Sequence, residues 1–167
     1  MKIERVELHR IALQYVHPFE TSFGRERQRE LILVSVSADG VTGWGECVAG
    51  AGPWYSYETV ETAGHVLQSF LIPALLGEQV ESPADAVARF GRVRGHAMAR
   101  ACLENAVWDL LARARGESLA AMLGGARERV PVGVSVGIEA TLDELLDRVA
   151  LHVEEGYGRV KLKIKPV

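Results

Sequence analysis

The chain has 167 residues, of which 48% are hydrophobic and 25% are charged, a composition typical of a folded globular protein. Its formal net charge is only −3 and its basic residues are dispersed, which argues against a nucleic-acid partner. The first residues alternate like a strand and lack the apolar core of a signal peptide, and no apolar run approaches the ~20 residues that span a membrane. We therefore expect a cytoplasmic protein that binds neither nucleic acid nor a membrane.

The first strands of the chain are predicted to form a three-stranded antiparallel meander. Residues 3–15 form the first strand, residues 31–38 the second and residues 41–48 the third. Asp39 and Gly40 separate the second strand from the third, and Asp-Gly between two apolar runs is a strong hairpin signal. Helical patterns follow this meander, so the expected fold class of the region is α+β.

Two loops that carry aromatic residues are expected beside the meander. Residues 17–25 contain Phe19 and Phe23, and residues 49–55 contain Tyr55 together with glycine and proline. Large apolar rings on such loops usually fold back onto the core, but they also line ligand pockets. The sequence leaves both interpretations open.

Three helices are predicted after the second loop. Ser56 is expected to cap the first helix, and Ser82 followed by Pro83 opens a short second helix. An alanine-rich third helix over residues 96–115 has the composition of a central packing helix. We place a domain boundary near residue 125, where this pattern gives way to an alternation of strand and helix.

From residue 130 onward the predicted order is strand, helix, strand. Residues 130–137 are a β-branched run bounded by glycine, and residues 160–164 are a second short strand. Between them, Thr141 followed three residues later by Glu144 is a capping box that begins an amphipathic helix. Two strands joined in this way lie parallel in one sheet.

Two lysines share one face of the last predicted strand. Successive side chains of a strand point to opposite faces, so Lys161 and Lys163 lie together. If this face points into a packed interior, desolvation and the neighbouring ammonium group both favour a neutral amine that acts as a base. If it faces water, the lysines only guard a solvated strand edge. Ser135 lies on the neighbouring strand, where it is either a packing residue or part of the same site.

Other chemical motifs are weak. Cys47 and Cys102 form no C-x-x-C pattern, so neither a disulfide framework nor a zinc site is expected. The 5 histidines are scattered, with no pair at metal-ligand spacing. The sequence has no G-x-x-x-x-G-K-[ST] phosphate loop and no G-x-S-x-G nucleophile elbow. No metal ligand is therefore assigned within this chain.

The order of these elements and several short motifs resemble a known family. The chain resembles the N-terminal part of enolase-superfamily proteins of the muconate-lactonizing subgroup, and more narrowly the o-succinylbenzoate synthase and N-acylamino acid racemase family. The stretches that carry the resemblance are Pro18–Gly24, Gly43–Cys47, Ala51–Tyr55, Phe70–Leu76, Gly133–Ile138 and the final Val-Lys-Leu-Lys-Ile-Lys-Pro.

The resemblance implies a capping domain over residues 1–125 and the start of a modified β/α (TIM-like) barrel over residues 126–167. In this family such proteins are lyases and isomerases that remove a proton next to a carboxylate. By this match Lys163 is the acid/base, while Lys161 polarises the enediolate. The resemblance also implies a magnesium ion that carries most of the negative charge, since a lysine or histidine base that works with magnesium is general in the superfamily.

The resemblance further implies a substrate pocket for a small carboxylate. Phe19, Phe23 and Tyr55 match positions on the two capping loops that close over the substrate side chain. Many relatives carry a larger apolar residue where this chain has Gly50, so the pocket is expected to be roomier here. Ser135 is included as a candidate pocket residue.

The family's magnesium ligands and its second catalytic lysine lie on later barrel strands, beyond residue 167. A full barrel needs about 250 residues, so we expect a truncated barrel, an inactive isolated chain and a homo-oligomeric full-length protein. The expected activity of that protein is o-succinylbenzoate synthesis for menaquinone, N-acylamino acid racemisation, or both. Dipeptide epimerase and muconate cycloisomerase are alternatives, and a non-catalytic capping-domain fragment is an alternative of a different class.

Overall fold

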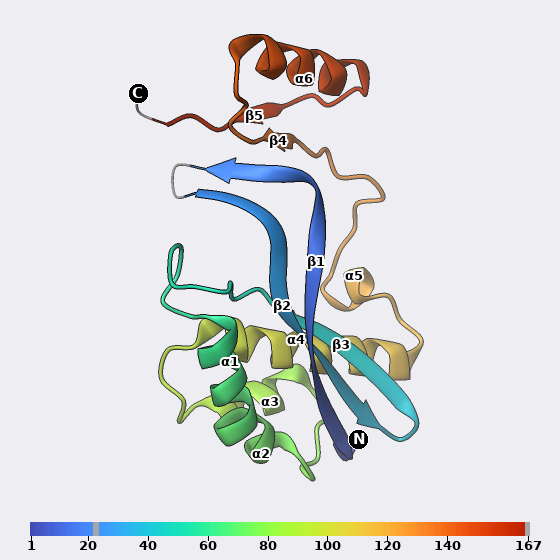
Figure 1. Cartoon of the computed structure of the whole chain (residues 1–167). Helices are drawn as coiled ribbons and strands as arrows, with labels where there is room; N and C mark the ends of the chain where they lie inside the picture. The colour runs from blue at the N-terminus through green and yellow to red at the C-terminus, as the bar shows by residue number, and fades with distance from the viewer. Residues whose placement is uncertain (22–23, 166–167) are drawn as a thin grey trace. The chain divides into compact units, whose positions relative to one another are not determined.

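Three consecutive strands form a sheet in the order β1-β2-β3, as the sequence predicts (Figure 1). The computed structural model describes residues 1–21 and 24–165. The strands are β1 (Arg5–Thr21), β2 (Gly24–Ala38) and β3 (Val41–Cys47). Asp39 and Gly40 turn the chain between β2 and β3 with φ angles of 49° and 76°. Positive φ at both positions is what a two-residue type I′ hairpin requires, so the predicted turn is confirmed.

The first hairpin is longer than predicted. The prediction of a loop over residues 17–25 is wrong, because residues 17–21 and 24–25 belong to strands. β1 continues to Thr21 and β2 begins at Gly24, although the side chains of residues 12–18 are exposed. The two strands are hydrogen-bonded neighbours, so their backbone groups are satisfied without an apolar face. Because the outer part of this hairpin has no buried face, its sequence lacks the alternation of apolar and polar residues that predicts a strand.

The chain separates into two compact units. Unit 1 consists of Met1–Leu13 and Glu30–Ala126, and unit 2 consists of Gln14–Arg29 and Arg127–Val167. The part of the first hairpin that carries Phe19 therefore belongs with the carboxy-terminal segment of the chain and not with the helices of unit 1.

In unit 1 a layer of helices packs on one face of the sheet, and α4 is its centre. The alanine-rich α4 provides much of the buried core, as its sequence predicts. None of the helices in residues 1–21 and 24–165 has both the length and the apolar composition of a membrane span. The helical elements of this unit are α1 (Val60–Val66), the π-helical turn η1 (Leu67–Leu71), α2 (Ile72–Leu75), α3 (Pro83–Phe90), α4 (Ala97–Arg115) and the short, unpredicted α5 (Leu119–Met122).

The backbones of β3 and α4 approach each other closely because β3 carries glycine on the face toward the helix. A Cβ atom on Gly43 would lie 2.2 Å from the carbonyl oxygen of Ala106, and one on Gly45 would lie 1.9 Å from that of Cys102. Cys47 continues this face and, like Cys102, is a buried free cysteine. Any side chain at Gly43 or Gly45 would push α4 away from the sheet.

Local capping chemistry sets the helix starts of unit 1. The predicted cap Ser56 is wrong: α1 begins after Thr59, whose hydroxyl accepts a hydrogen bond from the Thr62 backbone N–H. Ser56 accepts instead from the Glu58 backbone N–H, in a turn that precedes the helix. The predicted start of α3 at Ser82 is confirmed, and Asp85 accepts from the Ser82 backbone N–H at 2.8 Å.

Unit 2 contains the predicted strand-helix-strand. β4 (Val134–Val136) and β5 (Val160–Leu162) pair parallel, and α6 (Leu142–Glu154) connects them (Figure 1). The Thr141 capping box of α6 is confirmed. Both strands are shorter than the predicted ranges 130–137 and 160–164, because regular pairing in the described structure covers only three residues of each strand.

The close contact between β3 and α4 predicts a large stability difference between two glycine-to-alanine substitutions. Gly45→Ala places a methyl group inside a backbone contact, so we expect it to reduce the free energy of unfolding by about 3 kcal/mol. Gly64→Ala is the matched control, because its Cβ would meet only Ile32 Cδ1 at an ordinary 3.5 Å in helix α1. The control should stabilise the protein by about 0.5–1 kcal/mol. Urea unfolding followed by circular dichroism measures both, and equal effects of the two substitutions would contradict this packing.

Candidate active site

The parallel pairing of β4 and β5 brings three predicted site residues together in unit 2. Ser135 pairs with Lys161, so these side chains project from the same face of the two strands. The Lys163 backbone N–H donates to the Val136 carbonyl at 3.1 Å and extends the pairing beyond the end of β5. Lys161 is exposed and Lys163 is half-buried. Val136, on the opposite face, is buried.

The end of β1, at Phe19 and Glu20, contacts the segments that follow β4 and β5, also within unit 2. The Ile138 backbone N–H donates to the Glu20 carbonyl at 3.2 Å. The Lys165 ammonium donates to Glu20 Oε1 at 2.9 Å, and this bond holds the pKa of the Glu20 carboxyl below its usual range. The Lys163 Nζ atom lies 5.9 Å from the centre of the Phe19 ring, within the range of a cation–π contact. Phe19 thus contacts one of the two predicted catalytic lysines.

A cavity of about 800 Å³ opens between the hairpin and the segment that leads from β4 into α6. Its lining carries charges of both signs and does not include Lys161, Lys163, Ser135 or Phe19. The carboxylates are Glu20, Glu139, Glu144 and Asp147, and the basic side chains are His17, Arg25, Arg148 and Lys165.

The loop that carries Gly50 and Tyr55 belongs to unit 1, and its ends are fixed. Gly50 pairs with Thr59, and its carbonyl accepts from the Val60 backbone N–H at 2.8 Å. Between these ends the Tyr55 side chain is 90% exposed and that of Trp54 is 76% exposed. These rings do not fold back onto the core of their unit, so the interpretation of the loop as a packing element is wrong for them.

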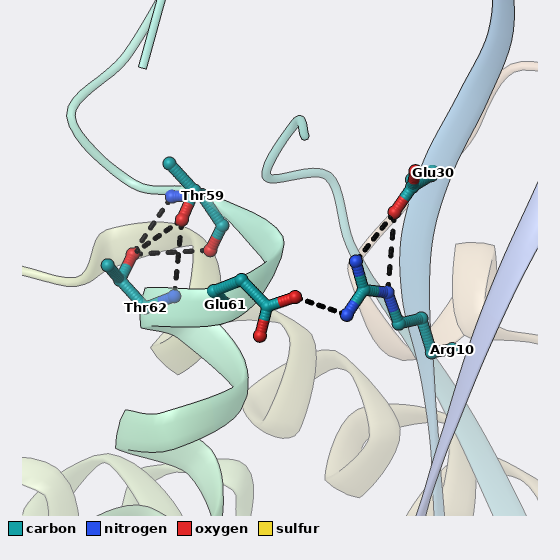
Figure 2. Close-up of polar contacts among 5 residues, drawn as sticks. All are labelled: Arg10, Glu30, Thr59, Glu61 and Thr62. Atoms are coloured by element: carbon teal, nitrogen blue, oxygen red, sulfur yellow. Dashed lines mark hydrogen bonds and ion pairs between the residues drawn. The ribbon is translucent and has the colours of Figure 1, made fainter. Parts of the chain in front are cut away.

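An arginine that the sequence analysis missed ties this loop's helix to the first hairpin (Figure 2). Arg10 on β1 donates to Glu30 on β2 at 2.8 Å and also pairs with Glu61 in the first turn of α1. These hydrogen bonds raise the pKa of the Arg10 guanidinium. Thr59 and Thr62 form the adjacent cap of α1. Arg10 therefore joins β1, β2 and α1 within unit 1.

Glu58 is a second residue that the sequence analysis missed. Its carboxylate is 2% exposed and accepts from the backbone N–H groups of Met98 and Ala99 at 2.9 and 3.1 Å. These are first-turn donors of α4 that have no partner within the helix. Glu58 thus fixes the end of the Gly50–Thr59 loop to the start of α4, with a negative charge at the positive end of the helix dipole.

The predicted site residues fall into three groups. Lys161, Lys163, Ser135 and Phe19 come together in unit 2, while Gly50 and Tyr55 lie in unit 1. Phe23 lies outside the described residues. Among residues 1–21 and 24–165, no group of three or more histidine, cysteine, aspartate and glutamate side chains is arranged to hold a metal ion.

Comparison with known protein families gives a match that covers most of the chain. The family described as mandelate racemase / muconate lactonizing enzyme, N-terminal domain, matches residues 5–124.

Curated relatives match the whole chain but extend well beyond it. The chain is 47% identical to an o-succinylbenzoate synthase of Geobacillus stearothermophilus over 99% of its own length and 44% of that protein. It is 48% identical to an N-succinylamino acid racemase of an Amycolatopsis species, with 45% of that protein covered. The chain therefore spans about half the length of the curated relatives that it matches.

Solved structures show the same arrangement of elements. A member of the enolase superfamily from Listeria innocua has a TM-score of 0.91 at 34% identity, and the match covers 99% of this chain and 45% of that one. An enolase-superfamily protein from Enterococcus faecalis has a TM-score of 0.87 at 42% identity, with the same coverage of both chains.

Proposed function

Because the chain belongs to the mandelate racemase / muconate lactonizing enzyme family of the enolase superfamily, we propose that it forms the N-terminal part of an enzyme that removes a proton next to a carboxylate. The observation that carries this proposal is the lysine face of β5. Lys161 and Lys163 project from one side of a parallel sheet, beside Ser135, and the Phe19 ring lies at the amine of Lys163.

In this proposal the two lysines have different roles. The Lys163 amine takes the α-proton of the substrate and returns it or passes it on, while the Lys161 side chain stabilises the negative charge on the carboxylate oxygens. Phe19 shields Lys163 from water on one side. Ser135, next to Lys161 in the register, contributes a hydroxyl group at the edge of the same face.

The proposed substrate is a small carboxylate. Relatives are named o-succinylbenzoate synthase and N-succinylamino acid racemase, and we propose one or both of these activities for the whole protein. A chloromuconate cycloisomerase of Cupriavidus pinatubonensis is 31% identical to this chain. The L-Ala-D/L-Glu epimerase of Bacillus subtilis, whose structure is solved, is 26% identical to it. Cycloisomerisation and dipeptide epimerisation are therefore the alternatives within the same chemistry.

Magnesium belongs to this proposal as an ion held outside the described residues. The described part of the chain offers no carboxylate cluster that fits it, so we assign no step of the reaction to a metal bound by this chain. A related structure from Roseovarius nubinhibens is described as complexed with magnesium at 31% identity. We propose that side chains beyond residue 167 supply the ligands.

We also propose a division of the chain into two domains, on the basis of the family match. We assign residues 1–125 to a capping domain and residues 126–167 to the start of a β/α barrel, with Gly50, Tyr55 and Phe23 on capping loops that contact the substrate. Barrel enzymes carry their catalytic groups at the carboxyl ends of the strands, and Lys163 follows directly after β5. A cytoplasmic homo-oligomer is the proposed form of the whole protein.

The first test of the proposal replaces the predicted base in the full-length enzyme. Lys163→Ala should abolish exchange of the substrate α-proton with deuterated solvent, and Lys163→Arg should do the same because a guanidinium group does not lose its proton. Lys161→Ala should reduce turnover by about 10²-fold through lost charge stabilisation. Proton NMR measures the exchange. Lys2→Ala, in unit 1, is the control, and retained exchange in either Lys163 variant would contradict the assignment.

The second test concerns substrate preference. Gly50 has no side chain, so we expect bulky acyl or side-chain groups to be accepted, and Gly50→Met should reorder a panel of N-acylamino acids by kcat/KM. The effect on the free energy of unfolding should be smaller than about 1 kcal/mol, as for most substitutions outside the core. An unchanged order across the panel would mean that this loop does not line the pocket.

The third test uses the 167-residue chain alone. A divalent cation in such a site needs several convergent oxygen ligands, which the described part of the chain does not bring together. Apolar side chains of α6 such as Leu142 and Leu146 are 68% and 55% exposed in unit 2, and exposed apolar side chains favour self-association. We therefore expect no turnover, no tight magnesium site and self-association. Calorimetric titration with magnesium and a racemisation assay decide the matter: single-site binding or measurable turnover would contradict the placement of the ligands beyond this chain.

A further inference from the structure

Cys47 and Cys102 are two buried thiols that the proposed reaction does not use. Both side chains are 0% exposed and belong to the hydrophobic core of unit 1. Neither cysteine is in a disulfide. Their spacing in the sequence shows no sign of a pair, so any relation between them comes from the packing of β3 on α4.

The register between β3 and α4 places the two cysteines near each other. A step of two residues along β3, from Gly43 to Gly45, moves the contact with α4 back by one turn, from the Ala106 carbonyl to the Cys102 carbonyl. The two steps have similar lengths, about 6.7 Å along a strand and about 6 Å along a helix. Cys47 lies one further step along the same face of β3, so it faces the turn of α4 that precedes Cys102.

The Cys102 side chain points toward that preceding turn. Helical side chains tilt toward the N-terminus of their helix, and the Cys102 Sγ atom lies 3.1 Å from the Ala99 carbonyl oxygen. The two thiols are hydrogen-bonded to each other, and the Cys47 thiol also accepts from the Ala49 backbone N–H. The Cβ atoms of a disulfide lie about 3.8 Å apart, and the direct contact between the two backbones permits such an approach.

The contact between the thiols makes the two sulfur atoms unequal. The hydrogen bond from Cys102 lowers the pKa of the Cys47 thiol, whereas the hydrogen bond to Cys47 and burial raise the pKa of the Cys102 thiol. The thiolate is the reactive form, so Cys47 is the nucleophile of the pair. The buried Glu58 carboxylate raises the pKa of both thiols, which slows the reaction without changing this order.

We propose that Cys47 and Cys102 form a reversible disulfide when a small peroxide, such as hydrogen peroxide, oxidises the protein. The Cys47 sulfur attacks one peroxide oxygen and the O–O bond breaks, which gives a sulfenic acid and one water molecule. The Cys102 sulfur then attacks the Cys47 sulfur, the S–O bond breaks and a second water molecule leaves. Two thiols thus lose two electrons and two protons, and one peroxide is reduced to two water molecules.

The disulfide would tie the start of the Gly50–Thr59 loop to the helix that already holds its end. Cys47 is the last residue of β3, shortly before this loop. At the other end of the loop, Glu58 accepts from the backbone N–H groups of Met98 and Ala99, in the first turn of α4. The effect on catalysis rests on the proposed function of the loop, but the formation of the disulfide does not.

Peptide mapping of the folded full-length protein tests the disulfide directly. After treatment with hydrogen peroxide and alkylation of the remaining thiols, mass spectrometry should find the Cys47 and Cys102 peptides linked, and dithiothreitol should separate them. Circular dichroism should show that the oxidised protein keeps its fold. This measurement needs no substitution, and the absence of the linked peptides from the oxidised protein would overturn the proposal.

Two matched variants test the order of the two steps. In Cys102→Ala the sulfenic acid on Cys47 has no thiol to attack it, so dimedone should trap it. In Cys47→Ala the remaining thiol has a raised pKa, and its labelling should be at least about tenfold lower. Equal labelling of the two variants would contradict the assignment of Cys47 as the nucleophile.

Amide hydrogen exchange tests whether the disulfide stabilises the contact between the loop and the helix. Exchange at Ala99, whose N–H binds Glu58, should be about tenfold slower in the oxidised protein. Leu145 is the control, because its N–H binds the Thr141 carbonyl in unit 2 and its exchange should not change. Equal exchange at Ala99 in the two states would overturn the proposed effect on the loop.

Kinetics connect the disulfide to the proposed reaction. A loop that is already ordered loses less entropy when substrate binds, so oxidation should lower KM for an N-succinylamino acid by about twofold to fivefold. Dithiothreitol should reverse the change, and Cys102→Ala treated in the same way should not show it. An unchanged KM in the linked protein would overturn the effect on substrate binding. If no form of the protein has activity, the proposed function fails, while peptide mapping still decides the disulfide.

Discussion

Parallel pairing between β4 and β5 is the constraint on which the candidate site depends. It places Ser135 beside Lys161, and its extension through the Val136 carbonyl fixes the direction of Lys163. Because side chains alternate along the extended segment, a shift of this register by one residue would turn the lysines to the opposite face. The contacts of Phe19 and Glu20 with this segment would then be lost. The placement of the residues to which we assign the proposed chemistry thus depends on a few backbone hydrogen bonds.

Within unit 1, the ends of the loop between Gly50 and Thr59 are fixed by contacts with neighbouring elements. Glycine at Gly43 and Gly45 lets α4 lie directly on β3, and Glu58 ties the start of that helix to the loop that begins at Gly50. Arg10 adds a link among β1, β2 and α1 (Figure 2). The loop is therefore held at its ends while its aromatic rings remain exposed. A fixed frame with exposed rings is the usual construction of a ligand-binding loop.

Much of this arrangement follows from local sequence signals. Asp39-Gly40 predicts the hairpin, Thr141 with Glu144 predicts the start of α6, and the alternation of lysines predicts their common face. Signals of this kind depend on a few neighbouring residues, which is why a single sequence reveals them. The features that the sequence did not reveal depend on distant partners. The extension of β1 to Thr21 rests on pairing with β2, without a buried face to mark it.

Distant partners also explain the missed side chains. The Glu20–Lys165 pair joins residues that are 145 positions apart, and Glu58 looks like any surface acid until α4 packs beside it. Thr59 and not Ser56 caps α1. Each hydroxyl accepts a hydrogen bond from a backbone N–H nearby, so the sequence alone does not tell which of the two residues is the cap.

The most direct measurement of the central claim is a crystal structure of the full-length protein with a bound N-succinylamino acid. The account predicts that Lys163 Nζ lies about 3–3.5 Å from the substrate α-carbon, the separation of a near-attack geometry, with Lys161 at the carboxylate. A substrate bound elsewhere, with the lysine face of β5 open to solvent, would contradict it.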